Sequence, residues 1–221
     1  MKSDADDPHR NQPVLQRGRA LDSAKGAVVL IHGRGASAED ILGLADEFGL
    51  PELAYLAPQA AEHTWYPYSF LEPLQQNQPW LDSALMMVAK TVHRAITAGI
   101  ERDQIAIVGF SQGACLATEF VVRNAARYGG VIAFTGGLIG PPGTKFVYSG
   151  ELLGTACFLG AGDRDPHVPW KRVEESASVL SALGGVVTLR RYPGLPHTIN
   201  RDEIEHAKTI LRRLIAKERA V

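Results

Sequence analysis

The stretch QIAIVGFSQGACLATEFVVRNAA, residues 104–126, decides how this chain folds. Its first part, 104–108, is short, apolar and β-branched, which is typical of a buried strand. Apolar residues recur at helical spacing over 114–126, so a helix is expected there. Between the two lies the pattern G-x-S-x-G, whose glycines permit a sharp, strained turn from strand to helix. The pattern predicts that the hydroxyl of Ser111 stands above the sheet.

Ser111 is therefore the candidate nucleophile of an active site. The next residue, Gln112, has its backbone N–H at the N-terminus of the expected helix, aimed at negative charge that develops beside the serine. A bare G-x-S-x-G also occurs by chance, and the alternative is an exposed serine in an ordinary turn. A strand before the pattern and a helix after it favour the catalytic interpretation.

A nucleophilic serine requires a base, and the base requires a carboxylate that orients it. Two later strands end in loops that carry both groups. The expected strand 155–161 is followed by GDRDPHVP, which contains Asp163 and Asp165, and the expected strand 186–192 is followed by PGLPHTIN, which contains His197. Both loops lie beyond the carboxyl ends of strands, the edge at which sites form in parallel α/β sheets.

Spacing alone does not separate Asp163 from Asp165. Asp165 precedes a proline, which biases it towards an extended conformation that aims its carboxylate across the strand ends, while Asp163 supports the turn. Among the seven histidines, His197 alone lies in the loop directly after the last strand, and it comes after the acid; His206 lies in the helical pattern beyond it. This is the chain order Ser, Asp, His that accompanies such a serine turn. His63 and His167 lie in loops near the expected site and remain alternatives for the base.

A second amide for a negatively charged oxygen is expected after an early strand. Residues 27–31 read as that strand, and they run into HGRGAS, residues 32–37. The two glycines of this segment allow a tight turn that brings the Arg34 N–H towards the same point as the Gln112 N–H. The alternative is a glycine-rich phosphate loop, but no Gly-Lys-Ser/Thr ending is present.

In this order the chain resembles the phospholipase/carboxylesterase family of small serine α/β-hydrolases, which includes acyl-protein thioesterases and bacterial carboxylesterases. The likeness covers nearly the whole chain and rests on HGRGAS, TWYPYSF, GFSQGA, GDRDPHVP and the His197 loop. It implies Ser111 as nucleophile, Asp165 as acid and His197 as base, with the amides of Arg34 and Gln112 as the oxyanion hole. Family members often carry an apolar residue where this chain has Arg34, which leaves the nature of the acyl substrate open.

The resemblance implies a carboxylesterase that hydrolyses short- to medium-chain esters of small molecules through an acyl-enzyme. An acyl thioesterase or a lysophospholipase would use the same residues, so these activities stay open. Dienelactone hydrolases have a similar fold but carry a cysteine at the position of Ser111. A non-catalytic binding protein is a third class, and the presence of Ser, Asp and His together argues against it.

Composition is that of a soluble globular protein. Hydrophobic residues make up 45% of the chain and charged residues 21%, and the formal net charge is −1. This balance gives no reason to expect nucleic acid or an anionic membrane surface as a partner. No apolar run approaches the roughly 20 residues of a membrane-spanning helix, and the N-terminus lacks the apolar core of a secretory signal. We expect a cytoplasmic enzyme without integral membrane association, metal or cofactor, in which both cysteines are buried.

The chain is expected to form a polar tail over 1–13, which includes His9, and a single catalytic domain over 14–221. Strands and helices alternate through that domain, which predicts an α/β fold with a mostly parallel sheet and helices on both faces. Strands are expected at 14–21 (an edge strand), 27–31, 53–57, 104–108, 130–134, 156–161 and 186–192, and helices at 37–47, 79–98, 112–126, 169–183 and 201–217.

Two insertions interrupt this alternation. The first, 59–78, carries aromatic residues that follow neither helical nor strand spacing. Its candidates to line an acyl pocket are Trp65, Tyr66, Tyr68 and Phe70. The alternative is that these rings only attach the loop to the domain. The second insertion, 136–154, is rich in glycine and proline, which suggests a mobile segment, and Leu138 is a candidate for another pocket wall.

Overall fold

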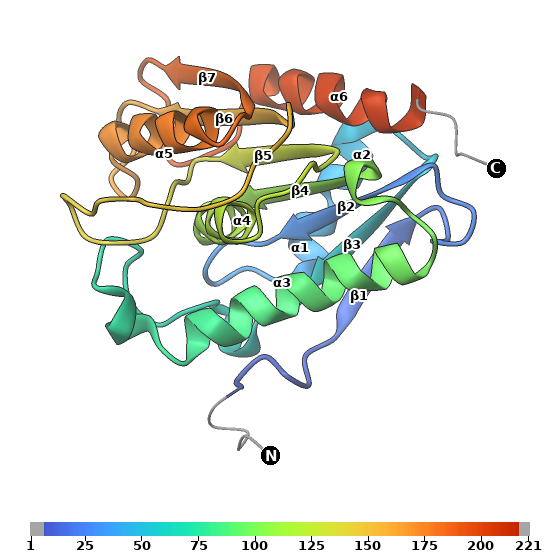
Figure 1. Cartoon of the computed structure of the whole chain (residues 1–221), viewed down its shortest axis with the longest axis horizontal. Coiled ribbons are helices and arrows are strands. Elements are labelled where there is room, and N and C mark those ends of the chain that lie inside the picture. Colours follow the sequence, from blue (N-terminus) through green and yellow to red (C-terminus); the bar gives the residue numbers. More distant parts are fainter. Residues whose placement is uncertain (1–6, 217–221) are drawn as a thin grey trace.

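The computed structural model describes residues 7–216 (Figure 1). Its centre is a seven-stranded sheet in the order β1-β3-β2-β4-β5-β6-β7. Every neighbouring pair is parallel except β1 and β3, which are antiparallel. The predicted α/β fold with a mostly parallel sheet is therefore confirmed. The strands are β1 (Val14–Gly18), β2 (Gly26–Ile31), β3 (Leu53–Pro58), β4 (Ile105–Phe110), β5 (Gly130–Phe134), β6 (Ala156–Gly162) and β7 (Val186–Tyr192).

Helices cover both faces of the sheet, as the alternation predicts (Figure 1). On one face lie α3 (Trp80–Thr97), α4 (Gln112–Arg123) and α5 (Trp170–Ala182), whose apolar residues share one core with the side chains of that face. On the other face lie α1 (Ala38–Leu42), α2 (Leu44–Phe48) and α6 (Arg201–Ala216), which form a second core. Every residue of β2 and β3 is buried. Central parallel strands covered on both faces read as continuous apolar runs for this reason.

The helix expected over 37–47 is two short helices that meet at Gly43. Ser37 caps α1 as expected for a helix start, because its hydroxyl accepts from the Asp40 N–H and the Asp40 carboxylate accepts from the Ser37 N–H. The chain tightens at the other end, where the Gly43 N–H donates to the Asp40 carbonyl at 3.1 Å. Glycine is a weak helix former, so a break falls at this position.

The N-terminal segment requires a correction, because His9 does not lie in a solvated tail. Its side chain is fully buried, with Nε2 at 3.0 Å from the Trp65 carbonyl oxygen and Nδ1 accepting from the Ala61 N–H at 3.0 Å. The ring lies between Trp65 and Trp80, with centroid distances of 5.4 Å to each. Composition alone indicated a tail, but these contacts are to residues more than fifty positions away. Residues 1–6 lie outside the described range.

Candidate active site

The turn at Ser111 has the geometry that the G-x-S-x-G pattern predicts. β4 ends at Phe110, α4 begins at Gln112, and Ser111 between them has φ 56° and ψ −121°. A non-glycine residue with positive φ is costly and is held only where the surrounding structure imposes it. The flanking glycines are required by space, because a Cβ at Gly109 would collide with the Gly113 carbonyl and one at Gly113 with the Ile31 carbonyl.

Three side chains from three loops meet at the carboxyl edge of the sheet. His197 Nε2 lies 2.8 Å from Ser111 Oγ, and His197 Nδ1 lies 2.6 Å from Asp165 Oδ2. A carboxylate only accepts hydrogen bonds, so the Nδ1–H donates to Asp165 and Nε2 accepts from the serine hydroxyl. The Asp165 side chain is fully buried, whereas that of His197 is 21% exposed. The structure therefore brings Ser111, His197 and Asp165 into one hydrogen-bonded chain that opens to solvent at the serine.

The two aspartates of the 163–165 loop have different partners. Asp165 Oδ1 accepts from the N–H groups of His167 and Val168 at 2.7 and 2.9 Å, which fixes the carboxylate while its other oxygen holds His197. Asp163 instead accepts from the Gly194 N–H at 2.7 Å and faces Arg191 at 3.8 Å. It ties together the two loops that follow β6 and β7, and it does not contact the imidazole.

The amides of Arg34 and Gln112 flank Ser111 at the ends of β2 and β4. Within residues 7–216, neither N–H donates to a protein acceptor, and Gln112 opens α4, where the first N–H groups have no partner in the helix. A hydrogen bond stabilises the turn that carries Arg34, since the Gly35 N–H donates to the His63 carbonyl at 2.7 Å. Gly35 itself has φ 76°, in the region that favours glycine. Two backbone N–H groups without a protein acceptor beside Ser111 suit the binding of an anionic oxygen.

Ser111 lies in a cavity of about 480 Å³. Its wall includes Tyr66, Tyr68 and Phe70, three of the aromatic residues expected there. Cys115 and Val168 also line the cavity and were missed by the sequence reasoning. The aromatic residues of the first insertion pointed to the right segment, but no periodicity in it separates the rings that face the cavity from those that face the core.

Trp65 and Leu138 do not line this cavity, and the expectation for both is wrong. The Trp65 side chain is fully buried, and its indole N–H donates to the His32 carbonyl at 2.8 Å. Leu138 is also fully buried, and its N–H donates to Ser176 on α5 at 2.8 Å. Both side chains belong to the core rather than to the substrate pocket.

The histidines left open as alternatives lie apart from the serine. His63 is exposed, with Nδ1 at 2.9 Å from the Ala36 carbonyl oxygen. His167 is exposed at the cavity rim, and its ring packs edge-on against His197 at 5.0 Å between centroids. Neither ring hydrogen-bonds to Ser111.

The cysteines, expected to be buried, are both buried and free. Burial raises the pKa of the Cys115 thiol and of the Cys157 thiol to about 12 each. Since the thiolate is the reactive form, a raised pKa makes the Cys115 thiol a poor nucleophile although it lines the cavity. In the described part of the chain, no three His, Cys, Asp or Glu side chains gather as metal ligands do. No helix within residues 7–216 has the length and apolar character to cross a membrane.

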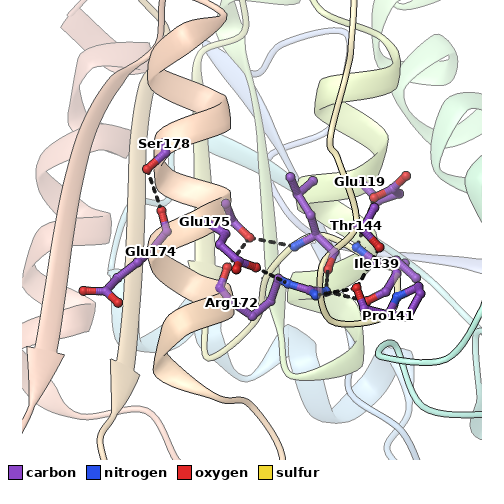
Figure 2. Close-up of polar contacts among 11 residues, drawn as sticks. Glu119, Ile139, Pro141, Thr144, Arg172, Glu174, Glu175 and Ser178 are labelled. Carbon is purple, nitrogen blue, oxygen red and sulfur yellow. Dashed lines mark hydrogen bonds and ion pairs between the residues drawn. The ribbon is translucent and has the colours of Figure 1, made fainter.

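The second insertion is fixed at several points, although its composition suggested a mobile segment. Figure 2 shows the Arg172 side chain reaching from α5 to this loop, where it donates to the carbonyls of Leu138 and Gly140 at 2.8 and 2.7 Å. From the other side, the buried Glu119 carboxylate of α4 accepts from the Ile139 N–H at 3.1 Å. The Arg172 guanidinium also lies over the ring of the cavity residue Phe70, 6.0 Å from its centroid. The loop thus supports the cavity wall from behind.

Replacing Arg172 by methionine is expected to destabilise the fold by about 3 kcal/mol, because buried carbonyls lose a charged donor and retain no alternative partner. The free energy of unfolding from urea titration measures this. Lys208→Met is the matched control, since Lys208 forms an exposed pair with Glu205 at 3.0 Å. Such pairs contribute about 1 kcal/mol or less. Equal losses in both variants would contradict the role assigned to Arg172.

Comparison with known proteins identifies the class to which this fold and site belong. The sequence profile of the phospholipase/carboxylesterase family matches residues 18–215. A solved structure of a phospholipase/carboxylesterase from Dyadobacter fermentans is 47% identical, with a TM-score of 0.87, and the match covers 91% of this chain and 97% of that one. The chain belongs to the phospholipase/carboxylesterase family. Family membership and the α/β-hydrolase fold, both expected from the sequence, are confirmed.

Curated relatives are more distant. Acyl-protein thioesterase 1 of Saccharomyces cerevisiae is 30% identical over 141 residues, which are 61% of this chain and 60% of the yeast protein. Lysophospholipase-like protein 1 of Mus musculus is 30% identical over 140 residues, 61% of this chain and 57% of the mouse protein. The matched region thus spans about three fifths of the length of these relatives.

Proposed function

We propose that this protein is a serine carboxylic-ester hydrolase that acts on small-molecule esters of short to medium chain length. The observation that carries the proposal is the continuous chain of hydrogen bonds from Ser111 through His197 to the buried Asp165, at 2.8 and 2.6 Å, inside a cavity of ligand size. Such cavities bind ligands at volumes of about 300–1,000 Å³. Membership of an esterase family supports the same assignment.

In the first half of the reaction, Ser111 Oγ attacks the ester carbonyl carbon while His197 Nε2 takes the serine proton. Asp165 keeps the imidazole in the tautomer that leaves Nε2 free to accept, and its charge stabilises the imidazolium that forms. The tetrahedral intermediate collapses, the alcohol leaves with the proton from His197, and the acyl group stays on Ser111. Water then attacks the acyl-enzyme with the same groups in the same roles, which releases the acid.

The negative charge on the former carbonyl oxygen is stabilised by the N–H groups of Arg34 and Gln112. The first donor lies in the glycine turn after β2, and the second is placed by the start of α4. Loss of one such donor costs about 3–4 kcal/mol of transition-state stabilisation.

Two measurements test the proposal together. A fluorophosphonate probe should label wild-type protein at Ser111, and aryl esters from acetyl to lauryl should be hydrolysed. A folded protein that neither reacts with the probe nor turns over any ester would instead be a binding protein with a hydrolase fold. The names of the yeast and mouse relatives favour a second candidate, acyl thioesterase or lysophospholipase activity of the same three residues. Thioesters and lysophospholipid in the same panel separate these activities by their kcat/KM.

Activity is expected to rise with acyl chain length and then to level off or fall between butyrate and octanoate. Each methylene that contacts the wall adds up to about 0.8 kcal/mol, a factor of about four in kcat/KM, and those that project into water add nothing. No lipase-type helical cover is present over the cavity among the described residues. A steady increase through palmitate would contradict this pocket.

Removal of the Tyr68 ring, rather than of the buried Trp65 ring, tests whether the cavity wall binds the acyl chain. Tyr68 lines the cavity and is 55% exposed, so Tyr68→Ala should flatten the rise with chain length without harm to the fold. Met86→Ala is the control, because Met86 is exposed to 53% on α3 and does not line the cavity. The ratio of kcat/KM between hexanoate and acetate measures the effect.

A further inference from the structure

The Arg34 side chain hydrogen-bonds to residues 66–68, the loop that forms part of the cavity wall. Its guanidinium donates from Nη2 to the carbonyls of Tyr66 and Tyr68, at 2.9 and 2.7 Å, and from Nη1 to the carbonyl of Pro67, at 2.7 Å. Three consecutive carbonyls therefore converge on one cation. Tyr66, Pro67 and Tyr68 all line the cavity around Ser111, and so does Arg34 itself.

Gln112, the other residue whose amide faces the serine, holds the same loop. Its side-chain oxygen accepts from the Trp65 N–H at 2.9 Å, and its side-chain nitrogen donates to the Tyr66 carbonyl at 2.8 Å. In both proposed oxyanion residues, the backbone N–H is directed towards Ser111, and the side chain hydrogen-bonds to the loop that forms the cavity wall. The two residues differ in burial, since Gln112 is only 7% exposed whereas Arg34 is exposed at the surface.

We infer that Arg34 is a positioning residue, whose side chain fixes the place of its own N–H and of the cavity wall together. The inference rests on the proposed function. Arg34 lies between two glycines, which are conformationally permissive, so the chain on both sides of it does little to hold its N–H in place. The bonds to three carbonyls remove that freedom before the substrate binds. An oxyanion donor acts through such preorganisation, because it stabilises the transition state only if it is already in place.

The chemistry of the side chain explains why arginine suits this position. A guanidinium is a planar fork with five N–H donors, whereas an ammonium is a compact point charge. Lysine at position 34 would reach one or two of the carbonyls and hold the wall less firmly. An apolar residue would hold none of them. Water would then take over the exposed carbonyls of Pro67 and Tyr68, and the Tyr66 carbonyl would keep its bonds from Gln112 and Thr64, so the fold itself would remain.

The test compares Arg34→Met, Arg34→Lys and wild type on the ester panel. Arg34→Met should lower kcat by about 100-fold with little change in KM, since an oxyanion donor misplaced by about 1 Å costs that much. Arg34→Lys should fall between the two. In Arg34→Ala, added ethylguanidinium should restore part of kcat, an effect that a general loss of stability would not produce. Arg17→Met is the matched control, because Arg17 also donates to a carbonyl, that of Leu42, far from the cavity.

A readout independent of activity is hydrogen–deuterium exchange of the peptide 64–70, which should become faster in Arg34→Met and stay unchanged in Arg17→Met. A folded Arg34→Met protein with wild-type kcat, or with wild-type exchange in this peptide, overturns the inference. Failure of the proposed function gives a different result, namely wild-type protein that the fluorophosphonate probe does not label. The exchange measurement still decides whether Arg34 holds the loop in that case.

Discussion

Replacing Ser111 with alanine is expected to reduce ester turnover by about 10⁵- to 10⁶-fold, because removal of a triad nucleophile abolishes the covalent route and leaves only binding and oxyanion stabilisation. The substitution removes one oxygen atom, whose hydrogen-bond partner is His197. The fold should therefore survive, with an unchanged unfolding midpoint. Steady-state hydrolysis of an aryl butyrate and covalent labelling by a fluorophosphonate measure the loss.

Ser178→Ala supplies the control for this experiment. Ser178 lies on α5 with its hydroxyl bonded to the Glu174 carbonyl at 2.9 Å, away from the cavity (Figure 2). It should keep wild-type turnover and labelling. Residual activity of Ser111→Ala above about one thousandth of wild type would remove Ser111 from the role of nucleophile.

Asp165→Asn is expected to lower kcat by about 10⁴-fold, because an amide in place of the carboxylate permits the wrong tautomer of His197. The asparagine side chain fits the same space, and its oxygen is still able to accept from the His167 and Val168 N–H groups. The loss should therefore fall on catalysis and leave the free energy of unfolding within about 1 kcal/mol of wild type.

Asp163→Asn is the matched comparison from the same loop. Asp163 accepts from the Gly194 N–H and faces Arg191, so its replacement should act on loop stability and change kcat little. Kinetics and urea unfolding of both variants separate the two effects. If Asp163→Asn gives the larger loss of kcat, the acid role moves to Asp163.

The strands and the order of the elements were predictable from sequence because each signal is local. The runs 104–108 and 27–31 are apolar and β-branched, and they are central strands covered on both faces. The motif around Ser111 also needs only local information, since the glycines on both sides are dictated by the turn itself. Fold and family were confirmed, and the three residues proposed for catalysis are hydrogen-bonded to one another.

The cavity wall was not predictable in the same way, because it depends on contacts between distant segments. Trp65 and Tyr68 lie three positions apart in one loop, yet the first is buried and the second is 55% exposed. The difference arises from His9 and His32, which pack against the Trp65 ring from other parts of the chain. Likewise, glycine and proline in the second insertion suggested mobility, while Arg172, more than thirty positions away from Leu138, fixes that loop.

The burial of His9 has a practical consequence for anyone who shortens this protein. Composition invites removal of everything before Val14, but that deletion would withdraw the imidazole from between Trp65 and Trp80 and leave the Ala61 N–H without its acceptor. The damage would reach the loop that Arg34 and Gln112 hold, through the Trp65 carbonyl. Affinity tags and fusion partners therefore belong upstream of Asp7, and trimming of the chain for crystallisation should stop there.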